Sequence, residues 1–391
     1  MLDIKYICTE INDWVINVRR DLHQTPELGL CEFETKSKII KYLDSIGIDY
    51  ISYKNHTGIT AYIDNNYEKT VALRADIDAL PIFEELNHTF KSIYPNKMHA
   101  CGHDAHTAIL LGTCKVLFSI KEQLNVNVKF FFQPAEETVG GAKLMIEDGC
   151  MENPNVDCIF GLHVMPHINT GNIELKYNTI NASTDTINIT IYGNKSHGAY
   201  PHQGTDAIVM SSFVISSLQT LVSRNISPTN SVVLTLGTIE GGISQNIICD
   251  KVYIKGTLRT LDSTTRDYAK DRIKDIVDLT CKSLGGKSDV YIEEGYPPLV
   301  NTNSLVDLVK KNSIELFGEN NVILREFPSL GAEDFSYYLN ITAGAFYHLG
   351  CSSKSKNITS PLHTSTFDID EDCLVNGIML HVKNILSTNF I

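Results

Sequence analysis

The sequence predicts an α/β protein with a second domain inserted into the first. At 391 residues the chain is longer than one hydrophobic core usually accommodates, so two domains are expected. Helices and strands alternate at the start, and this pattern changes near residue 184 and resumes near residue 297. We therefore expect one domain over 1–183 and 297–391, with residues 184–296 inserted into it.

The first domain is predicted from alternating apolar periodicities. Its expected elements are helices over 11–23, 32–46 and from about 104, and strands over 70–78, 126–134 and 158–163. Strands that alternate with helices are typical of an α/β layer built on a largely buried sheet.

The inserted segment has its own order of elements. The expected order is a strand at 183–193, a helix at 204–224, strands at 231–241 and 251–261, a helix at 263–285 and a strand at 288–295. This β-α-β-β-α-β order is that of a compact ferredoxin-like unit.

Charge and cysteine usage exclude several functions. The formal net charge of −13 disfavours nucleic acid and anionic membrane surfaces as partners. Charged residues interrupt every apolar run near the N-terminus, so we expect neither a signal peptide nor a membrane span, and a cytoplasmic location. The 10 cysteines are scattered without a CxxC pair, which is typical of reduced thiols in the cytosol.

The stretch MHACGHDAH at 98–106 concentrates possible metal ligands, among which Cys101 is the one cysteine set among histidines. Cys101 and His103 are two residues apart, and in extended backbone such side chains point to the same side and could bind one ion. Structural zinc, a nucleophilic cysteine and a catalytic metal are all compatible with this stretch. His99, Asp104 and His106 are expected to support the site rather than bind.

Further candidates follow other predicted strands. Asp76 and Asp78 end one strand, Glu136 and Glu137 follow another, and His163 ends a third. Open α/β sheets place their ligands at the carboxyl ends of such strands. Of two adjacent glutamates, one can bind an ion while the other acts as a general base.

Three residues of the inserted domain could bind a substrate. His197, in SHGAYPH, could donate a hydrogen bond to a substrate oxygen. Asn246 follows a flexible glycine pair and Arg259 lies in a predicted strand, and together they could receive a carboxylate, although a strand arginine is more often a surface ion-pair partner.

With these residues in view, the chain resembles the co-catalytic metallopeptidase family that contains the aminoacylases. It is most similar to the amidohydrolase branch with hippurate hydrolase, indole-3-acetyl-amino-acid hydrolases and N-acetyldiaminopimelate deacetylase. The resemblance rests on RRDLHQTPELG, LRADIDALPI, MHACGHDAH, FFQPAEET, GGAKLMIEDG, GLHVMP, SHGAYPH, GTLRT, GAEDFSYY and LHTSTFDID, which run nearly end to end.

The resemblance implies two divalent ions, Zn, Mn, Ni or Co, that share a water. The implied ligands are Cys101 as a bridge, His103, Glu137, His163 and the late-chain His363. Glu136 would be the general base. Asp78 matches the aspartate that orients a ligand histidine, whereas Asp76 replaces a histidine found in other branches.

The resemblance also implies a substrate, an N-acyl amino acid, and a lid and dimer contact formed by the inserted domain. A homodimer or homotetramer is therefore expected. His197 would polarise the scissile carbonyl, and Asn246 and Arg259 would receive the substrate carboxylate. A dipeptidase or aminopeptidase on the same site, or an inactive metal-dependent binding protein, are the alternatives. Retention of Glu136 disfavours the second, because a binding site needs no base.

Overall fold

The computed structural model describes residues 3–388 and divides them into two compact units. The first contains the chain up to Asn178, Val300–Phe327 and the chain from Asp334. The second contains Thr179–Leu299 and Pro328–Glu333. No pattern in the sequence marks the short segment Pro328–Glu333 as part of the second unit.

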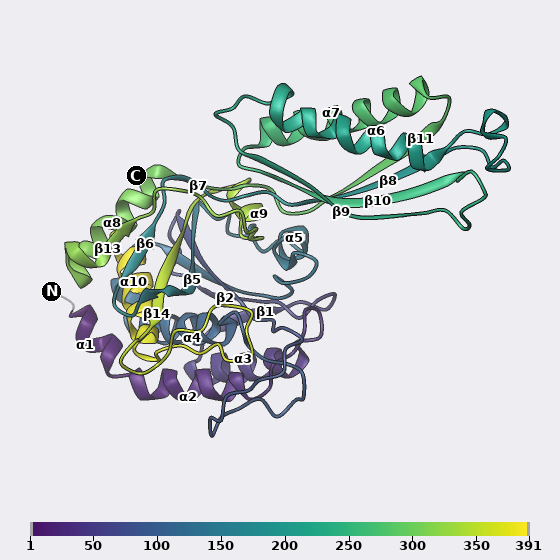
Figure 1. Ribbon diagram of the computed structural model, residues 1–391. Helices are drawn as coiled ribbons and strands as arrows, with labels where there is room; N and C mark the ends of the chain where they lie inside the picture. The colour runs from purple at the N-terminus through teal and green to yellow at the C-terminus, as the bar shows by residue number, and fades with distance from the viewer. Residues whose placement is uncertain (1–2, 389–391) are drawn as a thin grey trace. The chain divides into compact units, whose positions relative to one another are not determined.

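The first unit is built on a mixed eight-stranded sheet (Figure 1). Its strands, in spatial order, are β1 (Asp49–Ser52), β2 (Ile59–Ile63), β4 (Asn127–Gln133), β3 (Thr70–Asp76), β5 (Cys158–Asn169), β14 (Ala343–Ser352), β6 (Ile173–Leu175) and β13 (Val322–Leu324). The four central strands, β4, β3, β5 and β14, are parallel to one another. Every residue of β3 and β4 is buried, which explains their continuous apolar runs.

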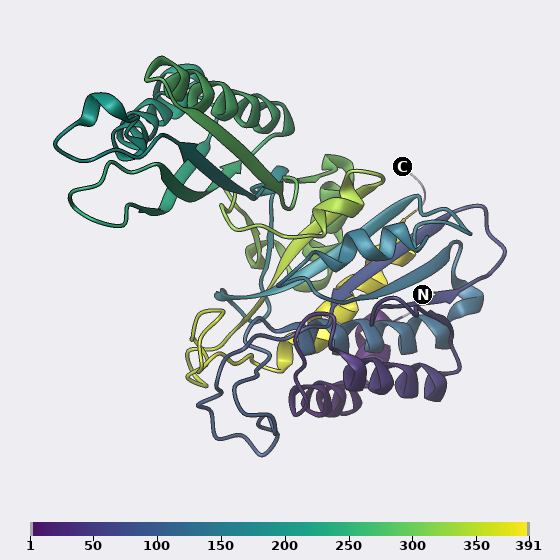
Figure 2. The ribbon, with the colours of Figure 1, turned by 90° about the vertical axis from the view of Figure 1, so that its right-hand side faces the viewer.

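Helices cover this sheet. Figure 2 shows the N-terminal helices stacked along one face of it. The helices of the unit are α1 (Ile4–Thr9), α2 (Asn12–His23), α3 (Phe33–Ile46), α4 (His103–Ser119), α5 (Gly141–Glu147), α8 (Asn303–Phe317), α9 (Ser336–Leu339) and α10 (Asp372–Ser387). Helix α4 packs against α2, α3, α10 and the sheet, and almost all of its side chains are buried. The start of α4 is therefore a fixed point at the edge of the sheet.

The second unit is a four-stranded antiparallel sheet with two helices. Its elements follow one another as β8 (Asp185–Tyr192), α6 (Ala207–Thr220), β9 (Val232–Gly241), β10 (Lys251–Thr260), α7 (Ser263–Ser283) and β11 (Lys287–Glu294). The spatial order is β11-β8-β10-β9, and α6 and α7 pack on the sheet with a core of their own. This β-α-β-β-α-β order is the one expected from the sequence, whereas a role as lid or dimer contact stays a prediction. A two-stranded sheet pairs β7 (Asn178–Asn181) with β12 (Leu299–Asn301).

Among the described residues, one helical stretch is long and apolar enough to cross a membrane by length and composition alone. It is Ala207–Asn225, which includes α6. A core helix passes the same test, and Met210, Val214 and Leu218 are buried within the core of the second unit. The stretch is therefore weak evidence for a membrane span.

A buried arginine joins the strand ends of the first unit. The Arg74 guanidinium in β3 donates to Asp76 Oδ2 at 2.7 Å, to Gln133 Oε1 at 2.8 Å and to Asp334 Oδ1 at 2.6 Å. Asp334 Oδ2 also accepts from Gln133 Nε2 at 2.6 Å and from the backbone N–H of Ala142 at 3.0 Å. This network ties the ends of β3 and β4 to the start of α5 and to the segment before α9.

Replacing Arg74 should destabilise the fold strongly. The Arg74→Met variant keeps the alkyl chain but leaves Asp76 and Asp334 buried without their cation, so we expect the free energy of unfolding to fall by about 3–5 kcal/mol. Urea denaturation measures the change. The matched control is Lys69→Met, which breaks a half-exposed pair with Asp157 and should cost less than about 1 kcal/mol. Equal losses in the two variants would contradict this account.

Candidate metal centre

Three neighbouring parallel strands bring the candidate residues to one edge of the sheet. β3 ends at Asp76, β4 ends at Gln133 just before the Glu136–Glu137 pair, and His163 lies in β5. Helix α4 begins with His103. Residues far apart in the sequence therefore meet where the sheet ends.

The backbone between Cys101 and His103 is not extended, so that expectation is wrong. Gly102 adopts φ +83° and is the N-cap of α4, which makes the segment a tight turn into the helix. A Cβ at Gly102 would lie 2.3 Å from Val164 Cγ2. A glycine is required both by the left-handed backbone and by this close approach. The turn nevertheless brings the donor atoms of Cys101 and His103 within 4.8 Å of each other.

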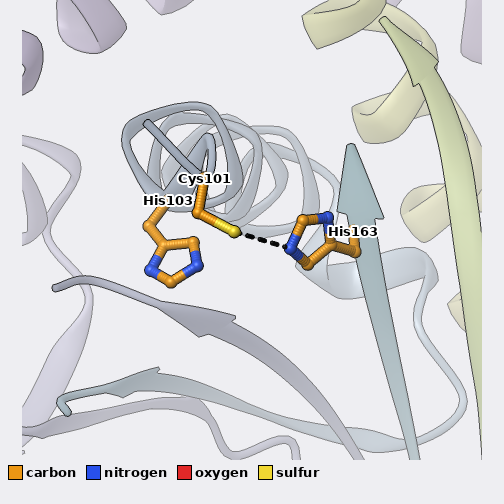
Figure 3. Close-up of side chains that lie close together, drawn as sticks. All are labelled: Cys101, His103 and His163. Carbon is orange, nitrogen blue, oxygen red and sulfur yellow. Dashed lines mark hydrogen bonds between the residues drawn. The ribbon is translucent and has the colours of Figure 1, made fainter. Parts of the chain in front are cut away.

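Cys101 and His163 face each other directly, as Figure 3 shows. The Cys101 Sγ lies 3.4 Å from His163 Nε2, and both side chains are buried. His163 Nδ1 lies 2.7 Å from the carbonyl oxygen of Val164, which can only accept, so Nδ1 carries the proton. The lone pair of Nε2 is therefore directed toward the thiol, which is the tautomer a metal ligand needs.

His103 is oriented in the same way by Asp78. His103 Nδ1 donates to Asp78 Oδ1 at 3.1 Å, and His103 Nε2 is buried without a hydrogen-bond partner. The other oxygen of Asp78 accepts from the backbone N–H of Glu137 at 3.0 Å. One carboxylate thus orients the imidazole and holds the backbone of the neighbouring glutamate.

His363 completes the group from the C-terminal part of the chain. Its Nε2 lies 3.1 Å from Glu137 Oε1, and its backbone N–H donates to Ala100 O at 2.8 Å. Three overlapping sets of donor atoms within 4.8 Å of one another consist of the expected ligands and Glu136: Cys101, His103 and His163; Cys101, Glu137 and His363; and His103, Glu136 and Glu137. Asp76, His103 and His106 form a further set, as do Glu136, Glu333 and Asp334. All five ligands expected from the sequence belong to these sets, and Cys101 is common to two of them.

The donor set fits divalent ions. One thiol, three imidazoles and a carboxylate are ligands that Zn, Mn, Ni or Co accept. Burial and the charges of Glu137 and Glu136 raise the pKa of Cys101 well above its usual value. Burial lowers the pKa of His103, but the charges of Asp76 and Asp78 outweigh it and raise the pKa to about 10. Without ions, both groups hold protons that a bound cation would displace.

The nearby polar residues have other partners. His106 Nδ1 donates to Asp76 Oδ1 at 2.5 Å, and His106 Nε2 accepts from the backbone N–H of Val164 at 2.9 Å, so neither nitrogen is available to an ion. Asp104 accepts from Arg19 Nε and from His23, both at 2.8 Å. The two aspartates contact the expected ligand His103 differently: Asp78 bonds to His103 Nδ1, whereas Asp76 is held by Arg74 and His106 and has its Oδ2 3.7 Å from His103 Nε2.

The expected substrate-binding residues lie in the second unit. His197 and Asn246 belong to adjacent loops, since the backbone N–H of Gly198 donates to Asn246 O at 2.8 Å. The exposed His197 ring accepts from the backbone N–H of Ala199 through Nδ1 at 3.1 Å. Arg259 lies in β10 and is partly buried, and its guanidinium has no hydrogen bond or ion pair in the described part of the chain.

Two buried residues near the site were missed by sequence reasoning. Arg74 anchors the strand ends, and Glu32 contacts the loop that carries Glu136. A charged residue within the apolar strand VALRAD was the available signal for Arg74. Glu32, just before α3, gives no comparable signal, because acidic residues are common at the start of helices.

Removing the shared thiol should empty part of the site. In Cys101→Ala the two sets that share Sγ lose a ligand, so we expect the retained ions to fall from about two per chain to about one or fewer. Metal analysis after dialysis measures this. Cys114→Ala, in helix α4 and also buried, is the control and should retain its ions. Full metal content in Cys101→Ala would contradict the assignment.

Comparisons with known proteins agree with this geometry. Residues 72–387 match the model of peptidase family M20/M25/M40. The chain is 38% identical over 379 residues to N-acetyl-L-cysteine deacetylase of Bacillus subtilis, covering 96% of this chain and 89% of the relative. It is 37% identical over 375 residues to IAA-amino acid hydrolase ILR1-like 4 of Arabidopsis thaliana, covering 95% and 84%. It is also 37% identical over 377 residues to thermostable carboxypeptidase 2 of Saccharolobus solfataricus, covering 95% and 94%.

A solved structure extends the likeness to the fold. The Bacillus subtilis protein YXEP, described as a dinuclear metal-binding peptidase of the M20 family, superposes with a TM-score of 0.84 at 30% identity, covering 97% of this chain and 98% of that one. The expected α/β metallopeptidase fold is thereby confirmed. The relatives named as a hydrolase and a deacetylase confirm the resemblance to the amidohydrolase branch. The chain belongs to peptidase family M20/M25/M40, in its amidohydrolase branch, and is a hydrolase that acts on amide bonds.

Proposed function

We propose that this protein hydrolyses N-acyl amino acids to a carboxylic acid and a free amino acid, using two divalent ions. The observation that carries the proposal is the position of Glu136. Its carboxylate lies within 4.8 Å of the donor atoms of His103 and Glu137, next to the ligand set. A second carboxylate at that position can accept a proton, which a purely structural metal site does not need.

In the proposed hydrolysis, each residue of the first unit's candidate site has its own role. Cys101, His103, Glu137, His163 and His363 would hold the ions, which would supply a water with a pKa near 7 and would polarise the amide carbonyl. Glu136 accepts the proton of the attacking water and delivers it to the leaving nitrogen. Asp78 holds His103 in the binding tautomer, and Asp76 keeps Arg74 and His106 in place.

Residues of the second unit are proposed to bind the substrate. His197 Nδ1 accepts a backbone hydrogen bond, so a neutral ring carries its proton on Nε2 and can donate it to the carbonyl oxygen. Arg259 has no ion pair among the described residues, and Asp185, the acid whose charge acts on Arg259, is already bound by Arg266 at 2.7 and 2.9 Å. We assign Arg259, with Asn246, to the substrate carboxylate. A homodimer or homotetramer formed through this unit is also proposed.

Replacing Glu136 should stop turnover and leave the ions in place. Glu136→Ala removes the base but none of the five proposed ligands, so we expect kcat to fall by about 10²-fold or more. Steady-state kinetics and metal analysis are measured on the same preparation. Glu147→Ala, an exposed carboxylate in α5, is the control and should behave as wild type. Loss of metal from Glu136→Ala would show that Glu136 is a ligand instead.

Replacing Arg259 should affect substrates selectively. We expect Arg259→Ala to lower kcat/KM by roughly 10²-fold on substrates with a free carboxylate, and much less on the corresponding amides, because only the former lose a charge-assisted bond. Arg272→Ala, on the surface of α7, is the control. Equal losses on both classes of substrate would remove Arg259 from the carboxylate site.

Peptide hydrolysis at the same site is the second candidate, and the likeness to a relative named a carboxypeptidase favours it. The deciding experiment uses metal-free protein reconstituted with Zn, Mn, Ni or Co in turn. Each preparation is assayed with acetyl- and benzoyl-amino acids and with dipeptides. Faster cleavage of the acyl-amino acids supports the proposal, and faster cleavage of dipeptides supports the alternative. No turnover of either class with any of the metals would support a binding protein.

A further inference from the structure

The N-terminal segment Glu27–Glu32 touches both loops that carry carboxylates of the site. The backbone N–H of Ala79, next to Asp78, donates to Glu27 O at 2.8 Å, and Leu28 forms a parallel bridge with Ala79. Glu32, at the other end of the segment, contacts the loop before Glu136. Nothing in the proposed reaction uses this segment directly.

We propose that Glu32 is a positioning residue that fixes the backbone beneath the general base Glu136. Its side chain is completely buried, and its Oε1 accepts from the backbone N–H of Ala135 at 2.9 Å. Its Oε2 lies 2.5 Å from Thr57 Oγ1, which holds the carboxylate from the other side. The inference rests on the proposed function, because it assumes that Glu136 is the base.

Ala135 is the point at which the loop needs support. It adopts φ +56°, a left-handed conformation that is unfavourable for a residue other than glycine. Two residues later, the backbone N–H of Glu137 donates to Asp78 Oδ2 at 3.0 Å. Glu136 therefore lies between two backbone N–H groups, each held by a buried carboxylate from a different part of the chain.

The segment can reach the loop because Gly29 has no side chain. A Cβ at Gly29 would lie 3.0 Å from Ala135 Cα and 2.4 Å from Thr138 Oγ1. The main chain of the segment thus packs directly on the loop that presents Glu136. This close contact is a second observation, independent of the Glu32 hydrogen bond, that ties the same two segments together.

The two supporting carboxylates have separable tasks. Asp78 holds the ligand His103 and the backbone of Glu137, so it acts on the metal-binding side of the loop. Glu32 holds Ala135 and contacts none of the five proposed ligands through a hydrogen bond. Loss of Glu32 should therefore displace the base and leave the ions bound.

A carboxyl or an amide can serve this task, whereas an apolar side chain cannot. Burial raises the pKa of Glu32 to about 7. In the protonated form the O–H can donate to Thr57 while the carbonyl oxygen still accepts from Ala135. Glutamine offers the same acceptor and donor, and methionine has a similar volume without either. These two substitutions separate the hydrogen bond from the packing.

The experiment compares Glu32→Met, Glu32→Gln and Thr57→Val. Each is assayed with whichever amide substrate the wild type turns over, its metal content is measured, and amide hydrogen exchange is followed at single-residue resolution. We expect Glu32→Met to lower kcat roughly 10- to 100-fold with KM within about threefold and metal content unchanged. Glu32→Gln should restore kcat to within about threefold of wild type. Thr57→Val breaks the other hydrogen bond of the same carboxylate but leaves the bond to Ala135, so it should lower kcat less than Glu32→Met does.

Hydrogen exchange needs no substrate, and its measurement on the wild type needs no variant. In the wild type the Ala135 amide should be protected although it lies outside helices and strands, and Glu32→Met should remove this protection but not that of Glu137. A freely exchanging Ala135 amide in the wild type would overturn the proposal even if Glu32→Met failed to fold. Equal loss of kcat in the Met and Gln variants, or loss of metal in Glu32→Met, would also overturn it. If the wild type cleaves no acyl-amino acid while Ala135 is protected as expected, the proposed substrate is wrong and the positioning role of Glu32 stands.

Discussion

The buried Arg74 guanidinium is the interaction on which the first unit depends. It sits in the strand β3 and bonds to Asp76, Gln133 and Asp334, all of which are buried. The cation allows several polar side chains to lie inside an apolar sheet, because each buried charge has a partner. The ends of β3 and β4 are thereby locked side by side, and the two carboxylate-bearing loops leave the sheet from fixed points.

Further contacts fix the side chains of the candidate metal site. Two of its three candidate histidine ligands are oriented through the nitrogen that does not face the ligand set: His163 by the carbonyl oxygen of Val164 and His103 by Asp78. Such contacts fix the direction in which each ring points. The left-handed turn at Gly102 does the same for the backbone, since it lets Cys101 and the first residue of α4 converge. The local conformations are thus those that binding requires.

Much of this arrangement follows from the sequence, for identifiable reasons. Apolar runs such as VNVKFFFQ predict buried strands, and ligands at their carboxyl ends follow from the geometry of α/β sheets. The local backbone was predicted wrongly: the extended conformation expected around Gly102 is a turn, because Gly102 adopts a left-handed conformation as the N-cap of α4. Short strands such as β6 and β13 carry too few residues to show a period. The contribution of Glu32 depends on a contact across 103 positions, which no local pattern encodes.

The order of the strands has a consequence for how the protein is made. β14 (Ala343–Ser352) is a central strand of the large sheet, inserted between β5 and β6, and His363 follows it. During synthesis from the N-terminus, β5 has no partner on that side until the whole second unit has been made. The second unit has its own sheet and core, and nearly all of it comes from one continuous stretch of the chain. It can therefore fold before β14 is available to complete the first unit. The proposed ligand set is complete only after His363 has been made, later than the whole second unit, so the growing chain cannot form the full candidate site before then.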